Sequence, residues 1–468
     1  MDMAPEEFRR AAHQAVDWMA DYLATSRERP VLPAVQPGKL TDALPRHAPE
    51  RGEPISEILA DFERLIPPAT THWNHPRFFA YFAVSGSGPG IIGEMLTAAL
   101  NVNGMLWKSG PAVTELEQVT LGWLREWLGL PPEFFGIIYD TASISTMHAL
   151  AAAREMTDPE ARKRGGLGDL VLYTSEQSHS SVEKGAITIG IGQQNVRRVP
   201  VDERFEMKPA ALREMIEADV HAGRKPFCVV ATVGTTSTTS VDPVGEIADI
   251  TEQHGLWLHV DGAYAGVAAM LPEMHGLLAA ASRAHSLVTN PHKWMLTPID
   301  CSAFYTRRPD LLRQAFSLVP EYLNTAEHPR AVNLMDYGVQ LGRRFRALKL
   351  WFVMRYFGRE GLAETMRTHI AIAQRFAELV RGDKRFELAA PVPFSVVCFR
   401  YAGSDEENRL LIEEINARTN SFLSHTVLNG RYVVRLAVGH ARTTWEDVQP
   451  VWDTMQSFAD GRGAAAGR

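Results

Sequence analysis

A lysine set between apolar residues is the first candidate for chemistry in this chain of 468 residues. Lys293 stands in the segment Asn290-Pro291-His292-Lys293-Trp294, directly after a short run typical of a buried strand. Burial disfavours the charged form of an amine, so a buried lysine has a lowered pKa and can attack a carbonyl group. On this segment alone, a surface lysine whose stem lies along apolar neighbours is an equally good interpretation.

An aspartate about one strand–helix–strand unit earlier is the second candidate. Asp261 follows the apolar run 256–260 and precedes the small residues of 262–266, against which a flat ring could lie. Pyridoxal phosphate needs both kinds of group, because a lysine holds its aldehyde and a carboxylate keeps its pyridine nitrogen protonated. Taken alone, Asp261 fits a capping or turn residue better.

Small and hydroxyl-bearing residues offer a place for a phosphate. Thr141, Ala142 and Ser143 follow the strand-like run 136–139 and precede the helical segment 147–156. The free backbone N–H groups and the dipole at such a turn favour a phosphate group. The same pattern also fits a helix N-cap without any ligand.

Two further polar residues follow strand-like runs. His179 could stack on a ring and pair with a substrate carboxylate, and Thr232 could hydrogen-bond a ring hydroxyl. A plain loop histidine and a satisfied turn threonine are the alternatives. All these candidates nevertheless fall at successive strand ends, and ligands of parallel sheets bind at the carboxyl ends of the strands. This shared position favours a single cofactor site.

The elements that must position these residues form an α/β pattern. Short, unbroken apolar runs suit strands buried on both faces of a mainly parallel sheet. These runs are 136–139, 170–173, 227–231, 256–260, 286–289 and 302–305. Helical segments between them, such as 209–222 and 245–254, are long enough for crossover connections.

Different patterns flank this region. Residues 8–23 have the apolar spacing of an amphipathic helix, and a second short helix is expected at 55–65. Beyond about residue 340, a long helix over 343–357 and 361–381 leads into strand candidates at 395–401 and 432–438. We therefore expect an N-terminal helical arm over 1–87, a large α/β domain over 88–345 and a small α+β domain over 346–468.

The composition argues against several other classes of protein. With 45% hydrophobic and 22% charged residues, the chain reads as a soluble globular protein, and neither a signal peptide nor a spanning segment is expected. A net charge of −7 without a basic tract argues against nucleic-acid binding. Three scattered cysteines fit the cytoplasm. We find no metal-binding histidine pair and no G-x-S-x-G motif, and the glycine-rich segment 86–90 lacks the lysine of a P-loop.

Several motifs together resemble the group II pyridoxal-phosphate-dependent amino-acid decarboxylases, and most of all the aromatic-L-amino-acid (DOPA, tyrosine, tryptophan) decarboxylases. The resemblance covers residues 5–455 in order. It rests on the segments 71–73, 180–183, 258–266, 290–294 and 341–346. It implies PLP fold type I, the aspartate-aminotransferase-like fold, with a mainly parallel seven-stranded sheet. It also implies a cytoplasmic homodimer whose active sites are shared between the two chains.

The resemblance assigns a role to each candidate. Lys293 forms the Schiff base, Asp261 contacts the pyridine nitrogen, His179 stacks on the ring beside the substrate carboxylate, and Thr232 lies near the ring hydroxyl. Ala263 touches the other ring face, and His292 precedes the lysine as in the family. The phosphate is bound by Thr141, Ala142, Ser143 and Asn290, joined by Leu341 and Gly342 of the partner chain.

The proposed reaction depends on Tyr322 and on an aromatic pocket. Tyr322 matches a loop tyrosine that gives a proton to Cα, directly or through His179, after carbon dioxide leaves. Relatives with phenylalanine there tend to be aldehyde synthases. We therefore expect an amine product. The pocket residues implied by the resemblance are Trp73, Tyr81, Phe82, Val84 and, reaching the partner's site, Asn103 and Met105.

The preferred substrate among tryptophan, tyrosine, DOPA and phenylalanine is left open. Val84, together with Ala83, departs from the family pattern, in which a proline and a polar residue are frequent at these two positions, and Asn103 and Met105 depart from it as well. The alternatives are an aromatic acetaldehyde synthase, a decarboxylase of a non-aromatic amino acid, and a catalytically silent binding protein.

Overall fold

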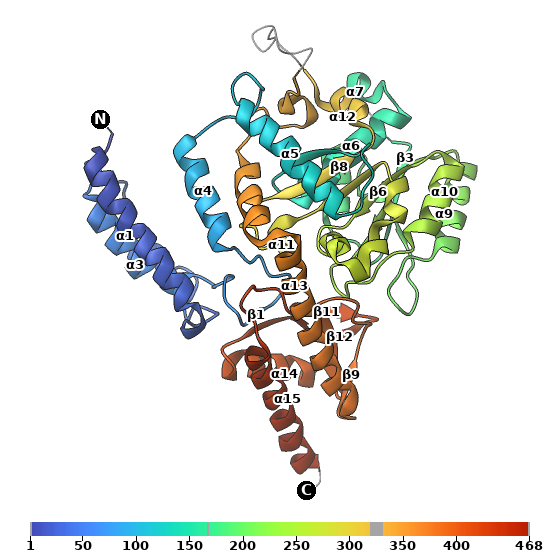
Figure 1. The fold of residues 1–468 in the computed structure, drawn as a ribbon. Helices are drawn as coiled ribbons and strands as arrows, with labels where there is room; N and C mark the ends of the chain where they lie inside the picture. Colours follow the sequence, from blue (N-terminus) through green and yellow to red (C-terminus); the bar gives the residue numbers. More distant parts are fainter. Residues whose placement is uncertain (1, 166–167, 319–330, 467–468) are drawn as a thin grey trace.

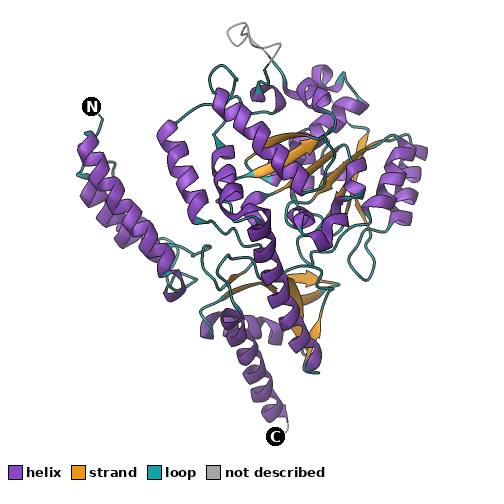
Figure 2. Cartoon of the chain, in the orientation of Figure 1, coloured by secondary structure: helices purple, strands orange, loops and turns teal. Residues whose placement is uncertain are grey.

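The structure, a computed structural model, describes residues 2–165, 168–318 and 331–466. Its largest layer is a seven-stranded sheet (Figures 1 and 2). In spatial order the strands are β2 (Phe135–Tyr139), β8 (Ser302–Thr306), β7 (Ser286–Thr289), β6 (Trp257–Asp261), β5 (Lys225–Thr232), β3 (Leu170–Ser175) and β4 (Val196–Val199). Only β8 is antiparallel to its neighbours. The predicted mainly parallel, seven-stranded sheet is therefore confirmed.

Helices cover both faces of this sheet, which explains why its strands are apolar on both sides (Figure 2). They are α5 (Pro111–Trp127), α6 (Ala142–Thr157), α7 (Ala161–Arg164), α8 (Ser181–Thr188), α9 (Pro209–His221), α10 (Val244–His254), α11 (Pro291–Trp294) and α12 (Pro309–Phe316). The crossover helices α9 and α10 match the two predicted segments within one residue at each end.

A second sheet of five strands lies below the first in Figure 1. Its order is β1 (Phe78–Phe79), β11 (Phe422–Leu428), β12 (Arg431–Ala437), β10 (Val396–Tyr401) and β9 (Phe386–Leu388). Strand β1 comes from the N-terminal region and pairs in parallel with β11. The segment just after β1, which carries the predicted pocket residues 81–84, is therefore anchored to the small sheet.

Three helices accompany the small sheet: α13 (Arg346–Gly382), α14 (Asp405–Arg418) and α15 (Trp445–Ala466). Gly358 interrupts α13 with φ 63° and ψ 178°, close to the break predicted between 357 and 361. The element bounds are compatible with domain boundaries at 87/88 and 345/346, since α4 (Gly88–Leu100) and α13 begin there. The boundaries themselves stay a prediction.

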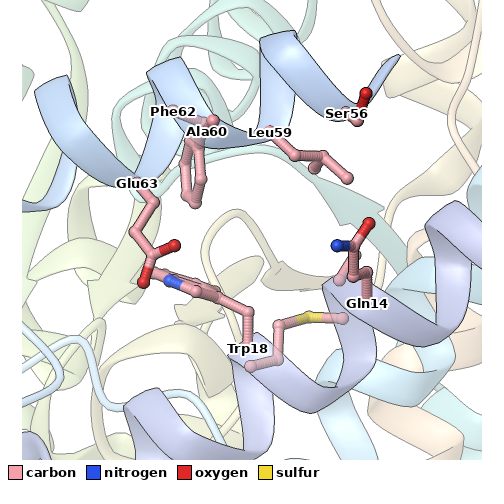
Figure 3. A pocket seen from close by; sticks show the side chains of 9 residues that line it. Gln14, Trp18, Ser56, Leu59, Ala60, Phe62 and Glu63 are labelled. Atoms are coloured by element: carbon pink, nitrogen blue, oxygen red, sulfur yellow. The ribbon is translucent and has the colours of Figure 1, made fainter. Parts of the chain in front are cut away.

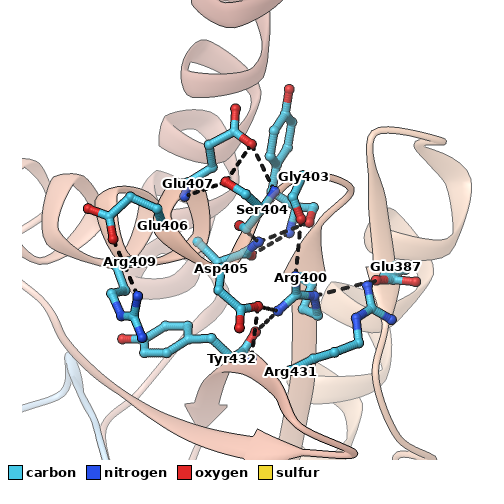
Figure 4. A network of polar contacts seen from close by, with 12 residues as sticks. Glu387, Arg400, Gly403, Ser404, Asp405, Glu406, Glu407, Arg409, Arg431 and Tyr432 are labelled. Carbon is cyan, nitrogen blue, oxygen red and sulfur yellow. Dashed lines mark hydrogen bonds and ion pairs between the residues drawn. The ribbon is translucent and has the colours of Figure 1, made fainter.

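A buried arginine joins the pieces of the small domain (Figure 4). Arg400 is 2% exposed, and its guanidinium donates to Asp405 Oδ1 at 2.7 Å, to the Gly403 carbonyl at 3.1 Å and to the Tyr432 carbonyl. Ser404 caps α14, and its partner in the capping box is Glu407. The contacts fix the start of α14 against β10 and β12.

The N-terminal arm consists mainly of α1 (Pro5–Ala24) and α3 (Ile55–Leu65), with the short α2 (Lys39–Ala43) between them. In Figure 1 the two long helices α1 and α3 lie side by side at the left of the molecule. Helix α4 is the next helix between them and the large sheet. Neither α1 nor α3 has a buried residue, although Trp18 meets Phe62 edge-on at 4.8 Å. Among the described residues, no helix has the length and apolar character to cross a membrane.

Candidate active site

The predicted cofactor residues surround one cavity of about 200 Å³ at the carboxyl ends of the central strands. The wall includes ten of them: Thr141, Ala142, Ser143, His179, Thr232, Asp261, Ala263, Asn290, His292 and Lys293. Each follows or ends β2, β3, β5, β6 or β7. The structure thus brings these ten residues together at the carboxyl ends of neighbouring strands.

Lys293 and Asp261 face this cavity from neighbouring segments. Asp261 is the last residue of β6, is 5% exposed, and accepts the Ala263 N–H at 3.0 Å. Lys293 lies in α11, just after β7, the neighbour of β6. Burial lowers the pKa of Lys293, and the nearby Asp261 carboxylate opposes that shift only in part. A lysine in this setting carries the neutral amine needed for attack on a carbonyl at a lower pH than an exposed lysine does.

The other end of the cavity is the start of α6. Thr141 is the N-cap residue, with extended backbone angles, and no side chain caps this helix. The N–H groups of the first helical turn lack intrahelical partners, and a helix N-terminus attracts negative charge. Ala142 and Ser143 thus offer two backbone donors to an anion at the cavity wall.

His179 has a defined protonation pattern. The Ser181 backbone N–H donates to its Nδ1 at 3.2 Å, and Ser181 Oγ lies 2.8 Å from the same atom. Because Nδ1 accepts a backbone N–H, the ring proton of the neutral form is assigned to Nε2. Burial lowers the pKa of His179, partly offset by Asp261. The neutral form with a donor at Nε2 is therefore favoured.

A column of aromatic rings supports the lysine. Phe82 stacks on Tyr264 at 4.0 Å, and Tyr264 stacks on Trp294 at 4.8 Å. Lys293 Nζ lies 5.1 Å from the centre of the Phe82 ring. Behind the column, Trp294 Nε1 donates to His369 Nδ1 at 3.0 Å. These packed contacts restrict how far the lysine and the Phe82 ring can move.

A second cavity, of about 390 Å³, adjoins the first. The two share Phe82, His179, Thr236 and Lys293. The further lining residues of the second cavity are Trp73, Tyr81, Val84, Ser237, Ser424, His425, Thr426 and Arg435. All four substrate residues predicted from residues 73–84 are present, and Trp73 stacks on Tyr81 at 5.7 Å.

Four predicted residues do not line either cavity of this chain. Asn103, Leu341 and Gly342 are exposed and Met105 is half-buried. Asn103 Oδ1 accepts the Arg343 N–H at 3.0 Å, so the two segments expected to reach a partner chain lie together. Their roles stay predictions. Tyr322 lies outside the described residues.

The structure adds residues that the sequence reasoning missed. Arg435 is the most prominent of these, because it is 4% exposed and makes no ion pair within the described part of the chain. Its guanidinium donates to the carbonyls of Ser237, Thr236 and Tyr81 at 2.9, 3.0 and 3.3 Å. An arginine in β12 of the second sheet, far along the chain from the predicted site, gives no sequence signal for this role.

The cavity contains polar atoms that suit a bound pyridoxal phosphate. Thr232 Oγ1 and Asn290 Oδ1 are buried and have no hydrogen-bond partner among the described residues. Buried polar atoms are nearly always paired, so these two atoms indicate a polar ligand. Together with the amine, the carboxylate and the free N–H groups of α6, the residues present fit this cofactor.

Comparisons with known proteins agree with this chemistry. A family model described as the pyridoxal-dependent decarboxylase conserved domain matches residues 37–402. The aromatic-L-amino-acid decarboxylase of Mus musculus is 41% identical over 475 residues, covering 98% of each chain. The phenylacetaldehyde synthase of a Rosa hybrid cultivar is 38% identical, covering 97% of this chain and 94% of its own length.

A solved structure extends the agreement to the whole fold. Oryza sativa TDC, solved with PLP and tryptamine, superposes with a TM-score of 0.95 at 36% identity over 99% of both chains. The cofactor is thus pyridoxal 5′-phosphate, and the enzyme is a lyase. From its motifs, its cavity and these relatives, the chain belongs to the pyridoxal-dependent decarboxylases, within the group that acts on aromatic amino acids.

Proposed function

We propose that this enzyme converts aromatic L-amino acids into arylalkylamines and carbon dioxide. The observation that carries the proposal is the continuity of the two cavities, one lined by Lys293 and Asp261 and the other by aromatic rings. An amino acid whose amine reaches Lys293 can thus place its side chain against Trp73 and Tyr81. The choice of amine over aldehyde rests on Tyr322 in the sequence.

The proposed roles follow from the protonation states of the side chains. Lys293 would hold the cofactor through its amine, and Asp261 would keep a proton on the ring nitrogen. The cofactor, when bound, supplies an electron sink for the bond that breaks at Cα. His179 Nε2 would donate to the substrate carboxylate, because Nδ1 is already an acceptor for Ser181. Tyr322 would return a proton to Cα.

The proposed aromatic preference follows from the wall of the second cavity. Trp73, Tyr81 and Phe82 offer ring faces, and burying an aromatic side chain contributes about 2 kcal/mol. An acidic substrate would need a free cation. Arg77 is engaged with Asp447 at 3.2 Å and with the Thr419 carbonyl. This pairing of Arg77 supports an aromatic over an acidic side chain.

Product analysis tests the proposal directly. Purified enzyme would receive tryptophan, tyrosine, DOPA, phenylalanine, histidine and glutamate in parallel, with amine, aldehyde, ammonia and hydrogen peroxide all measured. We expect amine without matching peroxide for at least one aromatic substrate. Activity on glutamate alone would contradict the aromatic assignment. Aldehyde, ammonia and peroxide in equal amounts would instead establish the synthase reaction.

Two variants make this test sharper. Lys293→Ala should abolish turnover, and full activity of this variant would overturn the mechanism. Tyr322→Phe should shift the products toward aldehyde and peroxide while cofactor binding is retained. If Tyr322→Phe still gives only amine at the wild-type rate, the proposed proton donor is wrong.

We also propose that the enzyme is a homodimer with shared sites. The groove between α1 and α3 opens to about 450 Å³ beside Trp18, Leu59 and Phe62, and Figure 3 shows these side chains bordering it. Exposed apolar side chains continue along one face of α4, at Ile92 and Leu96. A two-helix arm without a single buried residue needs another surface to cover it. A second copy of the chain would cover both faces.

Mixing two inactive variants tests the shared site. Lys293→Ala removes the lysine of one site, and Gly342→Trp places a bulky side chain where the partner's phosphate is expected. A mixed dimer would regain one intact site, so refolding the two together should restore up to about a quarter of the wild-type activity, the statistical share of such sites. Light scattering gives the assembly state. A monomer with full activity would contradict the proposal.

A cytoplasmic location is part of the same proposal. All three cysteines, Cys228, Cys301 and Cys398, are buried free thiols, which suits a reducing compartment. Cell fractionation followed by activity assay would test this. Activity recovered with the membrane or secreted fraction would contradict it.

A further inference from the structure

Thr232 contributes an unpaired hydroxyl to the cofactor cavity, and its position is controlled by another residue. Thr232 is the last residue of β5, is 4% exposed, and lines the cavity with Oγ1 unpartnered in the described structure. Its backbone N–H donates to Asp242 Oδ2 at 2.8 Å. Its backbone carbonyl accepts the Asp242 N–H at 2.9 Å. Asp242 thus holds both backbone polar groups of Thr232.

Asp242 does more than close a turn. Its second carboxylate oxygen, Oδ1, accepts the Met207 N–H at 2.8 Å, which ties the segment before α9 to the end of β5. Between Thr232 and Asp242 the chain forms a loop whose base is also closed by a bridge from Val233 to Val241. Thr236 of this loop lines both cavities. Asp242 therefore fixes two wall segments from outside.

The environment of Asp242 is unusual for a carboxylate. It is 1% exposed, and no ion pair to Lys or Arg is present among the described residues. Burial raises its pKa to about 7. A buried acid without a cation is costly, and its two backbone N–H donors offset this cost only in part. Asp242 does not line either cavity, so a direct contact with a ligand does not explain why a carboxylate is buried here.

We propose that Asp242 is a positioning residue that sets the Thr232 hydroxyl against the ring hydroxyl of the cofactor. The proposal rests on the role assigned to Thr232 from the family resemblance. A shift of Thr232 by a fraction of an ångström would lengthen a hydrogen bond to the ring oxygen and change the proton affinity of that oxygen. The visible absorbance of the bound cofactor reports this proton directly.

Four variants test the proposal: Thr232→Val, Asp242→Asn, the double variant, and Asp219→Asn as a matched control. Asp242→Asn keeps the shape, but its NH₂ group would meet one of the two backbone N–H donors. Asp219 is also a buried acid, paired with Arg197 and Tyr173 away from the cavity. For each variant, we would measure the affinity for the cofactor by titration, the visible absorbance of the bound cofactor as a function of pH, and the melting temperature.

We expect Thr232→Val and Asp242→Asn each to weaken cofactor binding by about five- to tenfold and to shift the absorbance pH profile in the same direction. In the Thr232→Val background, Asp242→Asn should cause no further spectral shift, because its effect passes through the hydroxyl. Asp219→Asn should lower the melting temperature without moving the profile.

The outcomes separate the two claims. If Thr232→Val leaves the profile unchanged, the role assigned to Thr232 is wrong, and the inference falls with it. If Thr232→Val shifts the profile and Asp242→Asn does not, or if the two shifts add fully, the inference alone is overturned. Should Asp242→Asn fail to fold, Asp242→Ser keeps one acceptor oxygen and serves the same comparison.

Discussion

Replacing Arg435 by methionine should damage the substrate site far more than the fold. Arg435 donates to Ser237 and Thr236 at normal hydrogen-bond lengths, and more weakly to Tyr81 and to Ser424 Oγ at 3.2 Å. It thereby links β12 to the loop after β5 and to the segment after β1. Methionine has a similar length but no donor, so these segments would lose their common anchor.

The magnitude follows from the two short bonds. Each contributes about 1 kcal/mol net, since removal of a buried cation also relieves its desolvation. Without these bonds, the substrate must itself order the wall of the second cavity when it binds. The activation free energy measured by kcat/KM should then rise by about 2 kcal/mol, which is a roughly 30-fold fall in kcat/KM. Most of this fall should be in KM, because the cofactor cavity does not include Arg435.

Steady-state amine formation with the best aromatic substrate measures this effect. Arg431→Met on the same strand is the control, since Arg431 is exposed and pairs only with Glu387 among the described residues. It should stay within about twofold of the wild type. An Arg435→Met enzyme with wild-type kcat/KM would refute the reasoning, as would a loss confined to kcat.

Three further predictions concern the fold and its dependence on pH. Gly234→Ala should lower the free energy of unfolding of the holoenzyme in urea by about 2–3 kcal/mol, because φ is +88° and an added Cβ would lie 2.6 Å from Ala265 Cβ. Gly255→Ala is the control: its φ is +65° and the space around it is open, so it should cost only about 1 kcal/mol. Equal losses would contradict the argument. Ser404→Ala removes the cap of α14 and should cost about 1 kcal/mol in the same assay, whereas Ser282→Ala, outside any such cap, should cost less. Burial lowers the pKa of several histidines to about 4, against 6.5 when unfolded, so the unfolded state binds more protons between these values. The free energy of unfolding should therefore fall as the pH is lowered from 6.5 to 4, by up to about 1.4 kcal/mol per pH unit for each histidine. Asp242, with its pKa raised to about 7, has the opposite effect in this range but is one group against six histidines. A urea midpoint that stays constant over this range would refute the prediction.

Much of the large sheet could be predicted because its strands are buried on both faces. Six of the seven strands matched apolar runs, since a central strand has no polar side to interrupt the pattern. The edge strand β4 was missed. It has the sequence Val-Arg-Arg-Val, and among the described strands it pairs with β3 alone, so its arginines remain partly exposed. Strand β1 has two residues, too few for any period.

The grouping of the candidate cofactor residues could be predicted for a related reason. Thr141, His179, Thr232 and Asp261 lie at strand ends, and the topology of a parallel sheet brings strand ends together whatever the intervening sequence. Arg435 and Asp242 had no such signal. Arg435 reaches the site because β12 of the small sheet lies next to the loop after β5 in the folded chain. Asp242 acts through the backbone groups of Thr232, ten positions earlier. Tertiary approach of this kind leaves no trace in local patterns.

The separate origin of the two cavities has a consequence for specificity. The cofactor cavity is lined mainly by residues at the strand ends of the large sheet, whereas the far wall of the second cavity comes from β11 of the small sheet. On that wall, Thr426 Oγ1 lies 2.9 Å from Ser237 Oγ, and His425 stacks on Tyr432. Side chains on this wall can change without moving Lys293 or Asp261. Substitutions at His425 and Thr426 should therefore alter the preferred aromatic ring while leaving the cofactor affinity unchanged. A parallel loss of cofactor binding would show instead that the two cavities form one energetic unit.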